Sequence, residues 1–335
     1  MRQMLRMMGQ YLRAGEDLVL VSITASSGAT PRGAGARMLV GRSGRLWGTI
    51  GGGAVEYHAQ QRAMEILEKK VSERQDYSLT RDDVQNLGMI CGGTVEVFFH
   101  YIPAGDENTA ELAALAEERF ARHEAMWLIS RISGGGELSL YTAADGFMGS
   151  PCPEWLEQRL TSRASIARQG EEQFSVEQIA SSGRVYIFGC GHVSMELEPL
   201  LTRVGFRCVV LADRPEFADR KLFPTAEEVH LVDFTRILDT VSVGPEDYVC
   251  VMTRGHAYDT LVQAQVLPCR PRYVGVIGSR KKAAAVRAAL RDRYGLSEEE
   301  LRLVTTPIGL DIGAETPAEI AVSVAAQMIA VRAAE

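Results

Sequence analysis

The stretch RVYIFGCGHVS, residues 184–194, decides the fold of the second half of this chain. Residues 185–188 are apolar and suit a buried strand, and a helical pattern follows the glycines. Gly189 and Gly191 almost match the spacing G-x-G-x-x-G, with Ser194 at the position of the third glycine. A strand, a glycine-rich turn and a helix in this order predict a Rossmann-type fold.

The rest of the second half repeats this alternation of apolar strands and helices. Strands that are apolar throughout and alternate with helices imply a parallel sheet covered on both faces. A final helix is expected over 315–333, with Thr316 as N-cap, Pro317 at the first helical position and Glu319 completing a capping box. We therefore predict a Rossmann-like domain with a mainly parallel sheet over 183–335. Its further strands are expected at 206–213, 227–233, 247–253 and 272–279.

The first half predicts a mixed α/β domain over residues 1–150. Alternating apolar segments and turn residues indicate strands, and longer amphipathic segments indicate helices. Residues 151–182 are polar and irregular, which predicts a connecting segment between two domains. We see no long internal repeat. Helices are expected at 2–13, 54–70 and 108–122, and strands at 17–24, in a hairpin over 37–50, at 93–102 and at 125–132.

Composition narrows the classes of function. The 335 residues carry a formal net charge of −7, which argues against a protein that binds nucleic acid backbones. No apolar run approaches the ~20 residues of a membrane span, and the N-terminus lacks a signal peptide pattern. The six cysteines have no C-x-x-C spacing, so neither a disulfide framework, a zinc ribbon nor an iron–sulfur site is indicated. These features predict a cytoplasmic α/β protein with reduced thiols and no membrane partner.

Polar residues collect after the predicted strands of the second half. Ligands bind at the carboxyl ends of strands in open α/β sheets, and three of these ends carry groups that are cationic or become so on protonation. Scattered loop polarity is the alternative explanation. In an acidic protein this clustering favours a pocket for an anionic, phosphorylated ligand. The residues are His192, Asp213 and Arg214, Arg254 and His256, and Ser279, Arg280 and Lys281, with Asp311 and Gly313 before the last helix.

A nicotinamide cofactor is the alternative ligand for this half. Asp213 ends the second predicted strand, where an acidic residue accepts hydrogen bonds from a ribose hydroxyl. An NAD(P)-dependent oxidoreductase would also need a general acid, for which His192 and His256 are the candidates. Ser194 in place of the third glycine, and Arg214 next to Asp213, weaken this hypothesis, and the fold alone does not decide it.

The first half contains a triple glycine, Gly51, Gly52 and Gly53, at the entrance to a predicted helix. Successive glycines can point several backbone N–H groups into one concavity that binds oxyanions, and Arg32 could add a positive charge. A tight strand-to-helix turn explains the same spacing equally well. Glu56 falls in the first turn of that helix, where it either complements the helix dipole or takes part in the site.

Cys91 differs in its context from the other cysteines. It precedes Gly92 and Gly93, so a ligand could approach it closely, and a thiolate suits transition metals and sulfur chemistry. Most isolated cysteines are small buried hydrophobes, and Cys190, Cys208 and Cys250 fit that description.

Taken together, these segments resemble the xanthine dehydrogenase accessory protein family (XdhC/CoxI). The resemblance covers nearly the whole chain through several motifs in one order. Gly51–Gly53, Glu56 and Cys91 match N-terminal motifs, and Gly189, Gly191, His192, Asp213, Ser279 and Arg280 match C-terminal ones. The motifs are SSGATPRGAGARMLV, GTIGGGAVE and GMICGG in the first half, and VYIFGCGHVSMELEPLL, VVLADRPEFA, YVGVIGSRKK and PIGLDIGAETPAEIAVSVAAQMI in the second.

The resemblance implies a cofactor chaperone rather than a catalyst. Members of the family bind molybdenum cofactor, promote its sulfuration with a cysteine desulfurase and deliver it to an apo molybdenum hydroxylase such as xanthine dehydrogenase. Cys91 would then ligate or shield the metal, and the other matched residues, with Arg32, would contact the molybdopterin. A homodimer is expected by analogy with a dimeric client. An NAD(P)-dependent oxidoreductase and a transferase acting on the pterin phosphate are the alternatives, although no carboxylate cluster for Mg²⁺ lies beside the glycine loops.

Overall fold

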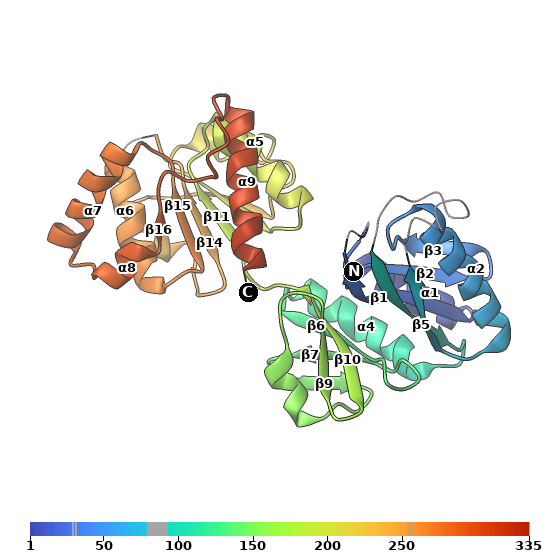
Figure 1. The fold of residues 1–335 in the computed structure, drawn as a ribbon. Coiled ribbons are helices and arrows are strands. Elements are labelled where there is room, and N and C mark those ends of the chain that lie inside the picture. The colour runs from blue at the N-terminus through green and yellow to red at the C-terminus, as the bar shows by residue number, and fades with distance from the viewer. Residues whose placement is uncertain (29, 31, 79–92, 255, 335) are drawn as a thin grey trace. The chain divides into compact units, whose positions relative to one another are not determined.

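The computed structural model describes residues 1–28, 30, 32–78, 93–254 and 256–334 of the chain (Figure 1). The chain divides into two compact units, Met1–Ser181 and Ser182–Glu335. No helix among the described residues is long and apolar enough to cross a membrane.

The second unit is built on a six-stranded sheet in the order β13-β12-β11-β14-β15-β16. Every neighbouring pair is parallel, as the uninterrupted apolar strands predict. The strand order reverses between β11 and β14, which is the point where ligands bind in folds of this type. The strands are β11 (Val185–Phe188), β12 (Cys208–Ala212), β13 (Glu228–Leu231), β14 (Tyr248–Val251), β15 (Tyr273–Val276) and β16 (Val304–Thr305).

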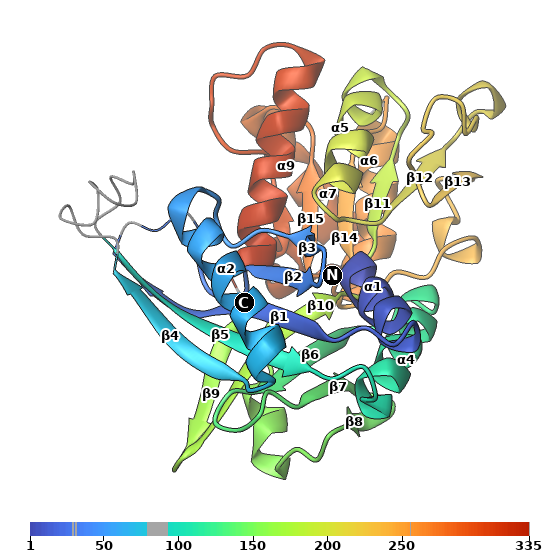
Figure 2. The same ribbon diagram turned by 90° about the vertical axis from the view of Figure 1, so that its right-hand side faces the viewer.

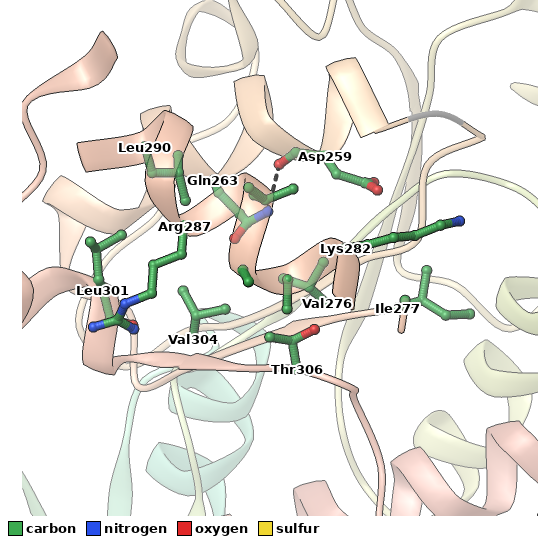
Figure 3. A pocket seen from close by; sticks show the side chains of 14 residues that line it. Asp259, Gln263, Val276, Ile277, Lys282, Arg287, Leu290, Leu301, Val304 and Thr306 are labelled. Carbon is green, nitrogen blue, oxygen red and sulfur yellow. Dashed lines mark hydrogen bonds between the residues drawn. The ribbon is translucent and has the colours of Figure 1, made fainter. Parts of the chain in front are cut away.

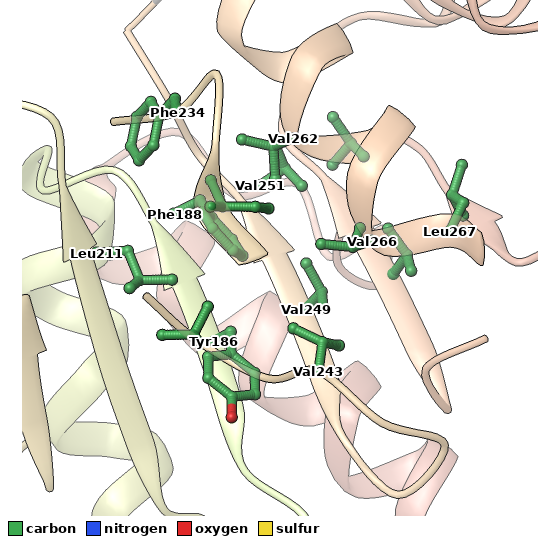
Figure 4. Packing of buried hydrophobic residues seen from close by; sticks show 14 of the residues in the cluster. Tyr186, Phe188, Leu211, Phe234, Val243, Val249, Val251, Val262, Val266 and Leu267 are labelled. Carbon is green, nitrogen blue, oxygen red and sulfur yellow. The ribbon is translucent and has the colours of Figure 1, made fainter. Parts of the chain in front are cut away.

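Helices cover both faces of this sheet (Figure 1). One apolar core joins α5 and α9 to the sheet, and a second, larger core joins α6, α7 and α8 to the opposite face. Figure 4 shows Phe188 and Val251 of the strands packing toward Val262 and Val266 of α6 in the larger core. The helices are α5 (His192–Arg203), α6 (His256–Val266), α7 (Arg280–Tyr294), α8 (Glu298–Arg302) and α9 (Pro317–Ala333), with short 3₁₀ turns η2 (Pro215–Phe217), η3 (Ile237–Asp239) and η4 (Leu267–Cys269).

The first unit contains two antiparallel five-stranded sheets. The first has the order β3-β2-β1-β5-β4, and α2 packs on one of its faces against β1 and β2 (Figure 2). Its opposite face shares one apolar core with α1, α4 and the second sheet. The elements are α1 (Arg2–Arg13), β1 (Leu18–Ser27), β2 (Arg37–Gly41), β3 (Gly44–Gly48), α2 (Gly53–Lys69), β4 (Glu73–Ser78), β5 (Thr94–Ile102) and α4 (Glu107–Ala121).

The second sheet has the order β8-β7-β6-β10-β9 and includes residues predicted to be a connection between domains. That prediction, for 151–182, was wrong: Phe174 and Val176 of β10 are buried, and β10 pairs with β6 and β9. The polar residues of β9 conceal that strand in the sequence, and β10 finds its other partner in the distant strand β6. The elements are β6 (Met126–Arg131), β7 (Leu138–Thr142), β8 (Gly146–Gly149), η1 (Glu154–Arg159), β9 (Ser165–Gln169) and β10 (Glu172–Ala180).

The two sheets of the first unit repeat one motif. Among the described elements, each half has a helix followed by three strands, a helical connection and two more strands, and the two sheets have the same strand order. The equivalent helices α1 and α4 pack against each other and contribute to the shared core. The repeat is therefore one of structure, and the sequence analysis, which found no long internal repeat, did not predict it. The copies differ in their connections: residues 28–36 join β1 to β2, whereas the shorter segment 132–137 joins the equivalent strands β6 and β7.

Candidate functional site

The glycine turn of the second unit lies at the carboxyl end of β11. Gly189 has φ of 107°, and a Cβ atom built on it would lie 2.3 Å from the carbonyl oxygen of Met252, so only glycine fits. Gly191 is the N-cap of α5 with φ of −78°, and a Cβ atom there would have no neighbour within 4 Å. No side chain among the described residues caps this helix. The first N–H groups of α5, starting at the exposed His192, therefore have no side-chain cap, and a helix start of this kind attracts anions.

Asp213 follows β12, the strand next to β11. The two strands pair in register up to Phe188 and Leu211, so the sheet brings Asp213 to the same edge as the glycine turn. The Nε atom of Arg214 lies 3.9 Å from Oδ1 of Asp213, and its guanidinium lies 4.3 Å from the centre of the Phe217 ring. Arg214 thus partly offsets the carboxylate that a ribose hydroxyl would contact.

A further group of predicted site residues lies at the start of α7, which follows β15. The hydroxyl oxygen of Ser279 accepts a hydrogen bond from the backbone N–H of Lys282 at 3.4 Å and so caps the helix that begins at Arg280. The side chains of Lys281 and Lys282 are exposed. Because β14 separates β15 from β11, this cluster shares the edge of the sheet with the glycine turn but lies two strands away.

Two buried polar residues of α6 were not predicted. The carboxylate of Asp259 is 4 % exposed and accepts a hydrogen bond of 2.6 Å from the hydroxyl of Thr253, and Gln263 is 1 % exposed. The prediction stopped at Arg254 and His256, where the strand ends. The signal that would have extended it is the spacing of Asp259 and Gln263, which places two polar groups on one face of a helix that packs on the sheet.

Burial raises the pKa of every described cysteine of this unit. Burial, and then the charge of Asp213, raise the pKa of Cys190 to about 12. Burial also raises the pKa of Cys208 to about 12 and that of Cys250 further. The prediction that these cysteines are small buried hydrophobes is confirmed for Cys208 and Cys250, whereas Cys190 is only partly buried. Among the described residues no three His, Cys, Asp or Glu side chains are grouped so that they could hold a metal ion.

In the first unit the triple glycine joins β3 to α2, and all three glycines have positive φ. The carboxylate of Glu56 reaches back to this loop and accepts hydrogen bonds from the backbone N–H groups of Ile50 at 3.0 Å and Gly52 at 3.1 Å. The hydroxyl of Thr49 also donates to it. The N–H groups of Ile50 and Gly52 thus bind a carboxylate of the chain itself, and an external oxyanion must use other groups or displace Glu56.

The positive charge beside this carboxylate comes from Arg45 of β3, which forms an ion pair with Glu56. Burial raises the pKa of Glu56, but the hydrogen bonds from Thr49 and Gly52 outweigh it, so the pKa lies below its usual range. Arg32, predicted to supply this charge, is exposed, and among the described residues it forms no hydrogen bond or ion pair. Arg45 was missed because it lies inside the predicted hairpin and outside the glycine motif.

The pairing of the strands places the ends of β1 and β4 and the start of the glycine loop at the same end of the first sheet. Ser27, the last residue of β1, pairs with Thr94, and their hydroxyls lie 2.6 Å apart. Thr94 also pairs with Ser78, and Gly48 pairs with Met38 of β2. The glycine loop therefore begins at the same end of the sheet at which β1 and β4 finish. Cys91, predicted to be a metal ligand, lies outside the described residues.

Two family models match the chain. The model described as "XdhC and CoxI family" matches residues 11–78, and the one described as "XdhC Rossmann domain" matches residues 185–328. The first covers the glycine loop and Glu56, and the second covers the glycine turn, Asp213 and the start of α7.

Similar proteins match over nearly the whole chain. A protein of Bacillus subtilis (strain 168), named as a probable xanthine dehydrogenase subunit, is 27 % identical over 97 % of this chain and 96 % of its own length. The uncharacterized protein YqeB of Escherichia coli (strain K12) is 23 % identical over 93 % of this chain, which spans 43 % of that protein. A crystal structure described as a xanthine dehydrogenase from Bacillus halodurans has the same fold, with a TM-score of 0.79, 23 % identity and coverage of 99 % of this chain and 96 % of its own. The order of motifs, the mixed α/β fold with its parallel sheet and the two model matches lead to one conclusion: this chain belongs to the XdhC and CoxI family.

Proposed function

We propose that the chain binds molybdenum cofactor as cargo, supports its sulfuration and delivers it to an apo molybdenum hydroxylase of the xanthine dehydrogenase type. Membership of the XdhC and CoxI family supports this role in maturation. The names of the Bacillus relatives, which refer to xanthine dehydrogenase, support the choice of client. A cysteine desulfurase as second partner, and a homodimer as the assembly, belong to the same proposal.

The observation that carries the proposal is the concentration of anion-binding groups at one edge of the parallel sheet. The uncapped start of α5 and the start of α7, with Lys281 and Lys282 beside it, lie along this edge in a chain with a net charge of −7. Molybdopterin carries a phosphate, and helix N-termini bind phosphates through backbone N–H groups and the helix dipole. This edge therefore suits the anionic end of the cargo.

The metal end of the cargo needs a different kind of group. The dithiolene holds the molybdenum, and a thiolate from the protein is the soft ligand that could protect it. The described thiols do not fit, because burial raises the pKa of all five, Cys152, Cys190, Cys208, Cys250 and Cys269. Cys91 is the remaining cysteine of the chain and is our candidate.

The test is binding of anaerobically released molybdenum cofactor to the purified full chain, followed by transfer to an apo-hydroxylase. We expect the wild-type protein to retain the cofactor and to activate the client. Cys91→Ser should lose both functions, and Cys152→Ser, a partly buried thiol of the same unit, is the matched control. A wild-type protein that retains no cofactor would refute the proposal, and full activity of Cys91→Ser would remove the role of that thiol alone.

An NAD(P)-dependent oxidoreductase is the second candidate, and one observation favours it. Asp213 lies beside the open start of α5, at the reversal of strand order, where dinucleotides bind in such folds. NAD⁺ and NADPH should be titrated in parallel with the cofactor. Tight binding of either one that Gly191→Ala weakens, without uptake of molybdenum cofactor, would favour this candidate.

A further inference from the structure

A cavity lies under the first half of α7, between this helix, α6 and the sheet. Its volume is about 140 Å³, and side chains of α6, α7, α8, β15 and β16 line it (Figure 3). The walls are mostly apolar, with Val276, Leu290 and Val304 among them. For comparison, an apolar cavity of about 150 Å³ admits benzene. The space beneath α7 is therefore large enough for one six-membered ring.

The sequence of α7 explains why the space exists. The helix has alanine at 283, 284, 285, 288 and 289, and Val286 is the single larger apolar residue before Leu290. Of the described side chains of α7, Leu290 is the first along the helix that is buried. Larger side chains on this face would fill the gap against the sheet. The first half of the helix thus stands away from the sheet, while Leu290 anchors the second half.

One buried polar group is available inside the cavity. The side chain of Gln263 is 1 % exposed, and its Nε2 atom donates a hydrogen bond of 2.9 Å to the carbonyl oxygen of Asp259, one turn earlier in α6 (Figure 3). That bond fixes the orientation of the amide and leaves Oε1 as an acceptor. Gln263 belongs to the lining of the cavity, so a ligand that brings an N–H group can donate a hydrogen bond to this amide.

Two charged groups of the lining are the carboxylate of Asp259, which accepts a hydrogen bond from Thr253, and the ammonium group of Lys282. Gly278 and Lys282 belong to the lining of the cavity, and they flank Ser279, the N-cap of α7. The ammonium group of Lys282 and the positive end of the helix dipole both attract an anion here. Arg287, which also lines the cavity, is held by Glu298 and by the carbonyl oxygen of Leu301, so Lys282 supplies the charge that a ligand can reach.

We infer that this cavity binds the pterin of the cargo, with one ring between α7 and the sheet and the phosphate-bearing arm at the start of α7. A pterin is a flat heterocycle whose ring N–H and amino groups can donate to Oε1 of Gln263, and Lys282 contacts the phosphate. The inference rests on the proposed function for the identity of the ligand. The same chemistry, a phosphorylated nitrogen heterocycle, is present in purine nucleotides, so the experiment separates the two sources.

The probes are 6-hydroxymethylpterin diphosphate, its unphosphorylated parent, and GMP, whose base has the same amino–oxo edge as a pterin. Binding to the full chain is followed by pterin fluorescence, and GMP is tested as a competitor. Ala283→Leu fills the cavity, and Ala285→Leu adds the same side chain to an exposed position of α7 outside the lining. Leucine is a good helix former, so both variants should fold, which circular dichroism checks.

We expect Ala283→Leu to weaken binding of both pterins by about tenfold or more, because the ring must displace the new side chain. Ala285→Leu should stay within about twofold of the wild type. Gln263→Leu should weaken both pterins by roughly 2- to 10-fold, the effect of one lost hydrogen bond. Lys282→Ala should weaken the diphosphate and leave the parent compound unchanged. GMP should compete poorly, and competition equal to the pterin diphosphate would reassign the cavity to a purine nucleotide.

The same variants are then tested with intact molybdenum cofactor, which separates this inference from the proposed function. If wild type and Ala283→Leu retain the cofactor equally, the cavity is not the pterin site and the proposed function stands. If the wild type retains no cofactor but binds the pterin diphosphate in a way that Ala283→Leu abolishes, the assignment of the cavity stands and the proposed function falls. No binding of the pterin diphosphate to the wild type overturns the inference.

Discussion

Two glycines separated by a single residue should respond to alanine in opposite ways. At Gly189 an added Cβ atom would lie 2.3 Å from the carbonyl oxygen of Met252, and φ of 107° is unfavourable for any L-residue. The strained backbone costs roughly 1–3 kcal/mol and relieving the clash roughly another 1–3 kcal/mol. At Gly191, φ is −78° and the new methyl group would contact nothing within 4 Å.

We therefore expect Gly189→Ala to destabilise the second unit by about 2–6 kcal/mol, a fall in Tm of roughly 4–24 °C for a unit of this size. The free energy of unfolding of Gly191→Ala should lie within about 0.5 kcal/mol of the wild-type value or slightly above it, because alanine restricts the unfolded chain. Each variant adds one methyl group to the wild type, and the two positions are only two residues apart, so each variant is the control for the other.

The tryptophans provide a way to assign the change to one unit. Trp47, Trp127 and Trp155 all lie in the first unit, so their fluorescence follows that unit, whereas far-ultraviolet circular dichroism follows both. In Gly189→Ala, the part of the dichroism transition that belongs to the second unit should move to lower temperature. The midpoint of the fluorescence transition, which follows the first unit, should not change. Equal stability of the two variants by dichroism would refute the geometric argument, and an equal shift of both signals would refute the independence of the units.

Three further predictions concern charges and thiols. Glu56→Gln should lower the free energy of unfolding at pH 7 by roughly 1.5–3 kcal/mol. Since the folded pKa of Glu56 is lowered, this difference from the wild type is present above the unfolded pKa of about 4.3 and vanishes as pH falls through the folded pKa. Urea titrations of both proteins at pH 7 and at a pH below the folded pKa would contradict the prediction if the difference in free energy were the same at the two pH values. Glu177→Ala should cost about 3–5 kcal/mol, because it leaves the buried guanidinium of Arg37 unpaired; a loss under 1 kcal/mol in the tryptophan-monitored urea transition would argue against this. Iodoacetamide at about pH 8 should alkylate Cys190 and Cys250 far more slowly in the native protein than in the unfolded one, since burial raises both pKa values, and timed peptide mass spectrometry showing equal rates would disprove it.

Local sequence signals predicted most elements of the fold. The last helix begins as expected: the hydroxyl of Thr316 accepts from the N–H of Glu319, and the Glu319 carboxylate accepts from the N–H of Thr316. Such caps involve neighbouring residues and are visible in sequence. The apolar strands of the second half likewise predicted their parallel pairing. By contrast, β10 pairs with β6 across a separation that no local pattern encodes, and the polar residues of β9 concealed the strand on its other side.

The sequence predicted the position of a site residue only where that position follows from the common direction of the parallel strands. Because parallel strands end at one edge, the sequence placed Asp213 beside the glycine turn. It did not predict that Glu56 turns back onto the glycine loop, since that contact depends on the loop conformation set by positive φ angles. Nor did it predict the cavity at Gln263, which exists because several alanines leave α7 away from the sheet.

The repeated motif of the first unit has a consequence for how a site can evolve. The two copies, which meet through the equivalent helices α1 and α4, resemble two protomers of a dimer joined into one polypeptide between Ile102 and Glu107. Identical protomers must carry every loop twice, so an insertion that disturbs one half disturbs both. A fused pair removes this constraint: the copy that contains residues 132–137 can keep the short connections that the scaffold requires, while the copy that contains the triple glycine is free to lengthen its own and specialise.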